Sequence, residues 1–202
     1  MISSTPPRML VIAGPNGSGK TTFARTYVAR NLLSGDIYVN PDDIAQKIFG
    51  DWNSPDAVVK AARESDRIRN DRLNNRQDLV FEAVLLSREK IDYLVRAKES
   101  GYEIHMIFVA TESPTINAGR VARRVLEGGH SVPISTIISR FNASIAQAVF
   151  VAQKGIVSHV QGYDNSEDLS APILVFEIAN GKIIEKAKVI PTWWRPFLEV
   201  IF

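Results

Sequence analysis

The sequence predicts an α/β fold in which a mainly parallel sheet carries helices on both faces. Three observations predict it: short apolar runs alternate with longer amphipathic stretches, the first run ends in a glycine-rich turn, and no shift of composition marks a domain boundary. Alternation of this kind is typical of parallel sheets, because a parallel connection needs a crossover that a helix supplies. We expect one three-layer α/β/α domain over residues 1–202.

Composition narrows the class of protein. The chain has 202 residues, of which 45% are hydrophobic and 23% charged, as in ordinary globular proteins. A net charge of +2 gives no general argument for a nucleic acid or membrane partner. The absence of cysteine excludes disulfides, thiolate metal sites and cysteine nucleophiles. The first apolar run is too short for a leader or a membrane span, so we expect a cytoplasmic protein.

The predicted strands are apolar runs bounded by turn residues. Residues 9–13 are rich in branched side chains and are followed by Gly14, which is typical of a buried parallel strand. Further strands are predicted over residues 37–40, 78–83, 102–110, 173–179 and 182–189. Asn180-Gly181 separates the last two, so we expect a C-terminal antiparallel hairpin at the edge of the sheet.

The predicted helices follow the strands. They cover residues 19–33, 41–49, 54–72, 87–100, 113–126 and 133–153. Ser54-Pro55-Asp56 combines an N-cap residue, a first-turn proline and a first-turn acid, which marks the start of the third helix. The helical period predicts a buried face there that is made of Val58, Ala61, Ala62, Ser65, Ile68 and Leu73.

The turn after the first strand carries the strongest functional signal. Its eight residues, which match the pattern G-x-x-x-x-G-K-[ST] between a strand and a helix, are Gly14, Pro15, Asn16, Gly17, Ser18, Gly19, Lys20 and Thr21. Glycines let the backbone wrap an anion, and the helix N-terminus adds positive potential. Lys20 would contact the β- and γ-phosphates of ATP, and the Thr21 hydroxyl would bind Mg²⁺. Thr22 completes the predicted ATP-binding set.

Acidic residues follow two predicted strands. Asp42 and Asp43 come after residues 37–40, and Glu82 lies near the end of residues 78–83. Because ligands bind at the carboxyl ends of parallel strands, Asp42 is placed to accept a proton from an attacking hydroxyl. Glu82 would bind substrate hydroxyls or orient a metal-bound water, and Asp43 is a further substrate-binding candidate. The alternatives are a helix N-cap for either aspartate and a surface carboxylate for Glu82.

Arginines gather on the helix predicted over residues 113–126. Arg120, Arg123 and Arg124 lie within five residues, next to Gly128-Gly129, which would permit a mobile lid. Arginines of this kind offset charge on a transferring phosphoryl group. The alternative is a solvated basic face. Arg140 is a further candidate for contact with the phosphoryl group, ranked below these three arginines.

Five blocks in fixed order resemble the zeta toxin family of P-loop kinases. They are residues 14–21, 39–44, 81–87, 120–133 and 163–166. The resemblance covers residues 8–166 and implies a P-loop NTPase fold like that of small nucleoside kinases. It also implies transfer of the ATP γ-phosphate to the 3′-hydroxyl of the sugar in UDP-N-acetylglucosamine.

The resemblance also implies residue roles. Asp42 matches the catalytic aspartate, Glu82 the substrate-binding glutamate, and Arg124 the lid arginine, with Arg120 as the second choice. His130 occupies the position of another family arginine, which is a departure from the family pattern. Asn165 matches a loop near the adenine.

Several functional alternatives stay open from the sequence. The acceptor is a small molecule such as a sugar nucleotide, or else a nucleoside, an antibiotic or a polynucleotide 5′-hydroxyl. The near-neutral net charge of the chain argues against the polynucleotide. A nucleotide-binding module without chemistry is the remaining class. A toxin would need an antitoxin as a separate chain.

Three further features have ordinary structural interpretations. His105 is predicted to have a satisfied structural role and His159 is isolated, so neither suggests a metal site with protein ligands. Trp193-Trp194 is predicted to pack on the sheet edge, with a protein interface as the alternative.

Overall fold

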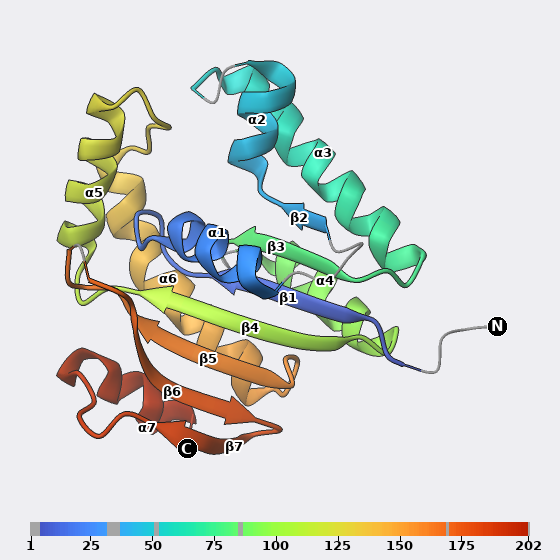
Figure 1. Cartoon of the computed structure of the whole chain (residues 1–202), viewed down its shortest axis with the longest axis vertical. Helices are drawn as coiled ribbons and strands as arrows, with labels where there is room; N and C mark the ends of the chain where they lie inside the picture. Colours follow the sequence, from blue (N-terminus) through green and yellow to red (C-terminus); the bar gives the residue numbers. More distant parts are fainter. Residues whose placement is uncertain (1–4, 32–36, 51–52, 85–86, 169, 202) are drawn as a thin grey trace.

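The structure is a computed structural model that describes residues 5–31, 37–50, 53–84, 87–168 and 170–201. In this part of the chain, seven strands form one sheet in the order β2-β3-β1-β4-β5-β6-β7 (Figure 1). The strands are β1 (Arg8–Ala13), β2 (Ile37–Val39), β3 (Leu79–Ala83), β4 (Glu103–Ala110), β5 (His159–Asp164), β6 (Ile173–Ala179) and β7 (Lys182–Lys186). The mainly parallel sheet and the C-terminal antiparallel hairpin are therefore confirmed.

The central strand β1 sets the position of the phosphate loop. It pairs in parallel with β3 and β4, and Ala13 at its end lies opposite Ala83 and Phe108. The Gly14 amide then donates to the Ala83 carbonyl at 3.3 Å, so the chain leaves β1 close to the end of β3. The predicted loop and the predicted Glu82 are thus brought to one edge of the sheet.

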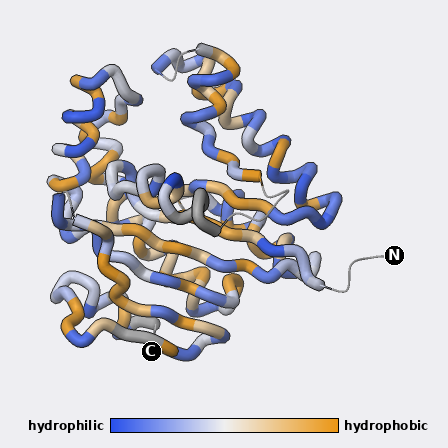
Figure 2. Tube along the Cα trace, in the orientation of Figure 1, coloured by the Kyte–Doolittle hydropathy of each residue, from blue (hydrophilic) through white to orange (hydrophobic). Residues whose placement is uncertain are grey.

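The helices cover the sheet unequally. They are α1 (Lys20–Asn31), α2 (Pro41–Phe49), α3 (Pro55–Asn74), α4 (Arg88–Glu99), α5 (Pro114–Leu126), α6 (Ile134–Gln153) and α7 (Arg195–Ile201). Ala24 of α1 packs in a small cluster on one face with Ile12, Val80, Ile107 and Val109. The larger cluster on the other face includes residues of α3, α4 and α6. Figure 2 shows hydrophobic stretches along the strands of the sheet. Helices on both faces are confirmed; residues 32–33, predicted as helix, lie outside the described residues.

Helix α3 differs from its predicted burial. Its buried residues include Ala57, Ala61 and Leu73 as well as Arg69, whereas Val58 is 39% exposed and Ala62 is exposed. The predicted face was therefore wrong at positions 58 and 62. Arg69 is buried because its guanidinium group makes cation–π contacts with the rings of Phe81 and Tyr93, whose centroids lie 5.2 and 5.5 Å from its guanidinium carbon.

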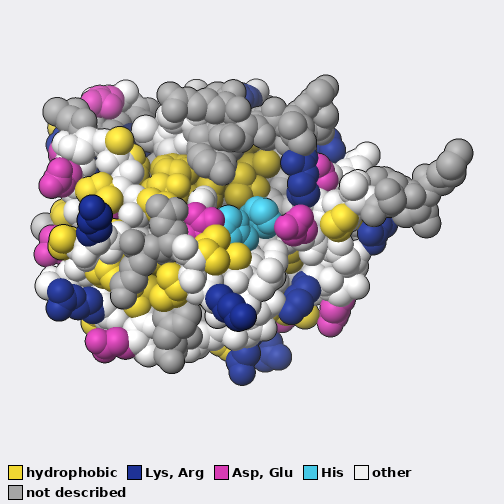
Figure 3. All heavy atoms as spheres, turned by 60° about the horizontal axis from the view of Figure 1, so that its bottom comes forward, with side chains coloured by type: hydrophobic (Ala, Val, Ile, Leu, Met, Phe, Trp, Pro, Cys, Tyr) yellow, Lys and Arg dark blue, Asp and Glu magenta, His cyan; other side chains and the backbone are white. Residues whose placement is uncertain are grey.

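Strand β5 was not predicted. Its exposed side carries polar residues: His159 Nε2 lies 2.6 Å from Glu177 Oε1, and Gln161 donates to Glu177 Oε2 at 3.1 Å. The polar side chains of β5 find hydrogen-bond partners on β6. Because these polar residues interrupt the hydrophobic pattern of the segment, the sequence did not indicate a strand there. Figure 3 shows histidine side chains next to acidic ones on the surface. His105, 3.0 Å from Glu103, has the satisfied structural role that we predicted.

Helix α6 is apolar along most of its length. In the described part of the chain it is the one helix that is long and apolar enough to cross a membrane by length and composition. Seven of its residues are buried, including Ile137, Phe141 and Ile145, so one side of the helix packs on the core.

Candidate active site

The loop between β1 and α1 is a backbone cradle. Gly14, Gly17 and Gly19 have φ values of +150°, +79° and +92°, which favour glycine. A Cβ on Gly14 would lie 2.0 Å from the Val109 carbonyl oxygen, and one on Gly17 would lie 2.5 Å from the Asn117 carbonyl oxygen. The three glycines therefore permit a packing that no other residue allows.

The cradle has the chemistry to hold a triphosphate. The Ser18 hydroxyl is buried and has no hydrogen-bond partner among the described residues. Lys20, only 9% exposed, donates from Nζ to the Pro15 carbonyl at 2.8 Å. Burial lowers the pKa of Lys20 to about 8, against the opposing effects of the Glu82 and Asp42 carboxylates. Phosphate oxygens would relieve the cost of this buried ammonium.

Glu82 joins three elements. Its Oε2 accepts from the Thr21 hydroxyl at 2.9 Å, and its Oε1 accepts from the Tyr38 hydroxyl and, at 3.1 Å, from Asn40 Nδ2. The side chain is buried, so the surface-carboxylate alternative was wrong. Burial raises the pKa of Glu82, and Lys20 opposes this rise. Tyr38 and Asn40 had not been predicted as site residues, although Asn40 stands directly before the predicted helix.

Asn40 also positions the candidate catalytic base. It is the N-cap of α2, and its Oδ1 accepts from the Asp42 amide at 2.9 Å. The alternative that Asp42 or Asp43 caps this helix was therefore wrong. The Asp42 carboxylate is instead 48% exposed, lies at the cleft and has His130 Nε2 at 4.0 Å. Asp43 lies 3.3 Å from the Arg25 guanidinium.

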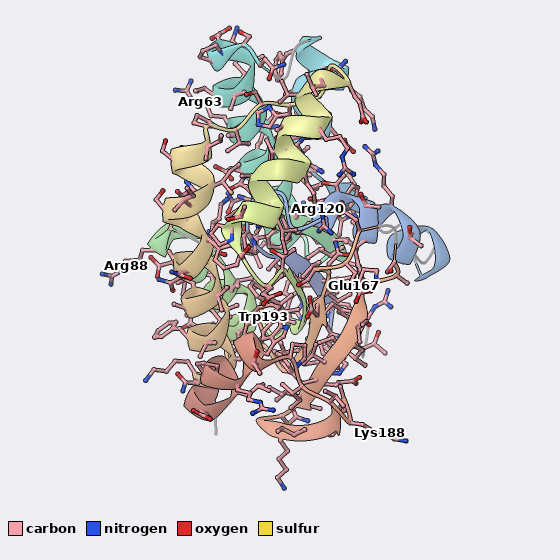
Figure 4. All side chains as sticks on the ribbon, turned by 90° about the vertical axis from the view of Figure 1, so that its left-hand side faces the viewer. Arg63, Arg88, Arg120, Glu167, Lys188 and Trp193 are labelled. Atoms are coloured by element: carbon pink, nitrogen blue, oxygen red, sulfur yellow. The ribbon has the colours of Figure 1, made fainter. Side chains whose placement is uncertain are left out.

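The α5 arginines divide their contacts. Arg124 donates to the His130 carbonyl at 3.0 Å, so it stays beside Asp42 and His130 in the cleft. Arg120 donates to the Asn165 carbonyl at 2.7 Å and to Asp168 at 2.9 Å (Figure 4). Arg123 also pairs with Asp168, at 3.0 Å.

These contacts separate the arginine candidates. Arg124, which the family resemblance favoured, contacts His130 beside the predicted base, while Arg120 holds the segment after β5 in this structure. The solvated-face alternative is wrong for Arg120, whose side chain is only 17% exposed, and it describes Arg123 better, at 61%. Arg140 is outside the described cleft lining.

Asn165 lies behind the phosphate loop. Its Nδ2 donates to the Ser18 carbonyl at 2.8 Å, and a Cβ on Gly19 would lie 2.3 Å from that nitrogen. Its own amide donates to the Ala110 carbonyl at 2.8 Å. Asn165 therefore supports the backbone of the loop, and its predicted contact with adenine stays a prediction.

One cleft unites most of the predicted residues. It has a volume of about 690 Å³ and lies between α2 on one side and α5 on the other. The predicted residues that line it are Asn16, Gly17, Gly19, Lys20, Thr21, Thr22, Asp42, Asp43, Glu82, Arg120, Arg124 and His130. Gly14, Pro15 and Ser18 shape the loop beneath it. Arg25 and Lys90 also line the cleft and were not predicted; a lysine in a helical stretch gives no distinguishing signal.

Mg²⁺ fits the donor set at the end of β3. Mg²⁺ in nucleotide sites is held by one or two carboxylates together with substrate phosphates. Thr21 supplies a hydroxyl and Glu82 a carboxylate, 2.9 Å apart. In the described residues no cluster of three or more histidines and acids could hold a metal by itself, so the phosphates would have to complete the coordination.

The sheet order and the glycine-rich cradle define a P-loop protein of the kinase-like α/β class. Within that class, the chain belongs to the Zeta toxin family, whose model matches residues 1–171. An uncharacterized protein of Haemophilus influenzae is 26% identical over 134 residues, which is 66% of this chain and 92% of that protein.

Two solved structures share the fold. The AvrRxo1-ORF1:-ORF2 complex with ATP superposes with a TM-score of 0.69 at 16% identity, over 98% of this chain and 64% of that chain. The PezAT chromosomal toxin-antitoxin system of Streptococcus pneumoniae gives a TM-score of 0.63 at 16% identity, over 98% and 86%. At such identities the likeness establishes the fold alone.

Proposed function

We propose that the protein is an ATP-dependent phosphotransferase that moves the γ-phosphate to a hydroxyl of a small molecule. The proposal rests on one observation: the Lys20 ammonium and the Asp42 carboxylate line the same cleft. The Lys20 ammonium lies in the phosphate loop, and the half-exposed Asp42 carboxylate lies near enough to raise its pKa. A phosphate held by Lys20 would therefore lie near the Asp42 carboxylate, which is exposed enough to accept a proton from a bound hydroxyl.

The residues divide the chemistry as follows. Asp42 accepts the proton of the acceptor hydroxyl, whose oxygen forms a bond to the γ-phosphorus while the bond to the bridging oxygen breaks and ADP leaves. Lys20 and Arg124 offset the charge on the transferring group. Thr21 and Glu82 would hold Mg²⁺, which neutralises phosphate charge when bound. Glu82, through Asn40, also fixes the backbone that carries Asp42.

The acceptor that we propose is a sugar nucleotide such as UDP-N-acetylglucosamine. The resemblance to zeta toxins supports it, and a cleft of about 690 Å³ has room for an acceptor next to the phosphates. His130 stands where the family has an arginine, so the particular sugar nucleotide has to be identified by experiment. Membership of the family, and a neighbour from a toxin-antitoxin system, support a toxin role with a separate antitoxin chain.

The decisive experiment replaces the proposed base. Asp42→Asn keeps the size of the side chain and the cap of α2, but the amide accepts no proton. We expect phosphate transfer from labelled ATP to a metabolite extract to fall about 10²–10⁴-fold, while the affinity for ATP changes little.

Asp56→Asn is the matched control, since it removes an exposed carboxylate that pairs with Lys60 outside the cleft. It should retain most of the transfer activity. Equal activity of Asp42→Asn and the parent protein would exclude the assigned base. Tight ATP binding with no product from any extract would favour a nucleotide-binding module instead.

A further inference from the structure

Lys90 is a cation that lines the cleft and forms no ion pair with the residues that the structure describes. It lies in the first turn of α4 and lines the main cleft together with Asp42, Glu82 and His130. Among the described residues, no hydrogen bond or ion pair reaches its ammonium group. Its neighbour Arg88, by contrast, points into solvent with a side chain 93% exposed (Figure 4). The two positions carry the same charge but face different surroundings.

The surroundings of Lys90 do not neutralise it. Arg69 and Arg140 act on it as like charges, and Asp66 and Glu89 as opposite ones. Asp66, however, already forms an ion pair with Arg69. Lys20 in the phosphate loop is a further like charge within electrostatic reach.

Arg69 lies next to Lys90, with its own charge paired to Asp66. Its side chain is 7% exposed, and its Nε is buried with no partner among the described residues. Lys90 lines both the main cleft and a small cavity of about 30 Å³, whose lining includes Arg69 and the carboxylates of Asp66 and Glu89. On the side of the main cleft, a half-buried ammonium in the first turn of a helix is destabilising unless an anion offsets it.

The position of Lys90 assigns it to the acceptor rather than to ATP. In the sheet, β3 and β2 lie on one side of β1, while β4 and β5 lie on the other. Lys90 follows β3 and lines the same cleft as Asp42. The segment after β5, which packs on the phosphate loop through Asn165, is on the opposite side. If the nucleoside of ATP extends toward β5, the group at Lys90 belongs to the molecule that presents its hydroxyl to Asp42.

We propose that Lys90 is a specificity-determining residue of the transfer reaction, whose ammonium group binds a phosphate group of the acceptor. The acceptor is then a phosphorylated alcohol, which includes sugar nucleotides and sugar phosphates and excludes neutral sugars and nucleosides. This inference rests on the proposed phosphotransferase function. It adds the residue that selects for a charged acceptor, and it leaves the base, Asp42, unchanged.

The test separates candidate acceptors by charge. A metabolite extract is divided by anion exchange into anionic and neutral pools, and each pool is incubated with the protein and labelled ATP. We expect the product to arise from the anionic pool. With the purified acceptor, Lys90→Gln should raise the acceptor KM about ten- to hundredfold, as for loss of a charge-assisted hydrogen bond. The KM for ATP should not change, and Lys90→Arg should restore much of the acceptor affinity.

Arg88→Gln is the matched control, because it removes an equal charge from the same helical turn outside the cleft. A product from the neutral pool, or an equal acceptor KM in Lys90→Gln and the parent protein, would overturn this role of Lys90 while the phosphotransferase stands.

A second measurement needs no turnover. Burial and Arg69 lower the pKa of Lys90, so acetylation by a dilute acylating reagent should reach it readily. With the phosphate loop filled by a non-hydrolysable ATP analogue, inorganic pyrophosphate should protect Lys90 severalfold. Lys98, at the other end of α4, should react as before. Unchanged labelling of Lys90 would contradict phosphate binding at Lys90 even if no acceptor were ever found.

Discussion

A single carboxylate, that of Glu82, connects the phosphate loop to the candidate base. It accepts hydrogen bonds from Thr21 of α1, from Tyr38 of β2 and from the cap residue Asn40. A buried charge is tolerated only when its lone pairs are satisfied, so the network fixes these three donors together. Because Asn40 in turn accepts a hydrogen bond from the Asp42 amide, a substitution at Glu82 would change the position of the Asp42 backbone.

The ionisation of Lys20 predicts how ATP affinity depends on pH. In the free protein its pKa is lowered to about 8, whereas bound phosphates would raise it. Below pH 8 the ammonium is already charged and affinity should be flat. Above pH 8 binding must take up a proton, so we expect Kd to rise about tenfold between pH 7.5 and 9.5. Calorimetry in buffers of different ionisation enthalpy would measure the proton uptake.

Lys20→Met serves as the control for this pH dependence. It should bind ATP weakly at every pH and show no proton uptake near pH 9. If the parent protein bound ATP equally well at pH 7.5 and 9.5, Lys20 would not have the lowered pKa on which the argument depends.

At the scale of elements, the phosphate loop depends on contacts that only a glycine allows. Gly17→Ala combines an unfavourable φ of +79° with a Cβ 2.5 Å from the Asn117 carbonyl oxygen. We expect a loss of about 2–4 kcal/mol of unfolding free energy and loss of ATP binding. Urea denaturation and calorimetry with ATP would measure the two effects.

Gly155→Ala separates the two causes. Gly155 has a φ of +57°, but a Cβ there would meet nothing within 4 Å. It should cost only about 1 kcal/mol and leave ATP binding intact. Equal losses in the two variants would mean that the contact with Asn117 contributes nothing.

The sequence predicted elements well where one signal dominated. The cap residue Ser54, the first-turn residues Pro55 and Asp56 and the hairpin residues Asn180 and Gly181 act over a few residues, and the structure has α3 and the β6–β7 hairpin where these signals lie. Strand β5 was missed because its polar side chains are satisfied by partners on β6, distant in sequence. Burial of Arg69 was missed for the same reason, since its ring partners come from β3 and α4.

At the scale of the whole molecule, the C-terminal segment packs against the sheet. Trp194 is 2% exposed, and its ring makes edge contacts with Phe108 of β4 and Phe176 of β6, at 6.0 and 5.2 Å between centroids. The predicted packing of Trp194 against the sheet is confirmed, but its ring partners lie on inner strands and not on an edge strand. Trp193 Nε1 donates to Asp164 at 3.1 Å and ties the segment to the end of β5.

Trp194→Ala should therefore destabilise the protein without changing the site. We expect a loss of about 3–5 kcal/mol of unfolding free energy, as for large cavities in cores, measured by urea denaturation. The KM for ATP at low temperature should stay the same. Val189→Ala, at a position 82% exposed, is the control and should cost little. A small effect of Trp194→Ala would show that the C-terminal segment is not part of the stable core.

The sequence by itself determined the phosphate loop, the strand-helix alternation and the family, because these depend on short-range patterns of glycine, charge and hydrophobicity. Only the tertiary structure decided which side chains meet. It paired Glu82 with Tyr38 and Asn40, turned Arg120 toward Asp168, and left Lys90 facing the cleft. The physical reason is that burial and charge neutralisation depend on neighbours brought together across the sheet, and such neighbours leave no local pattern in the sequence.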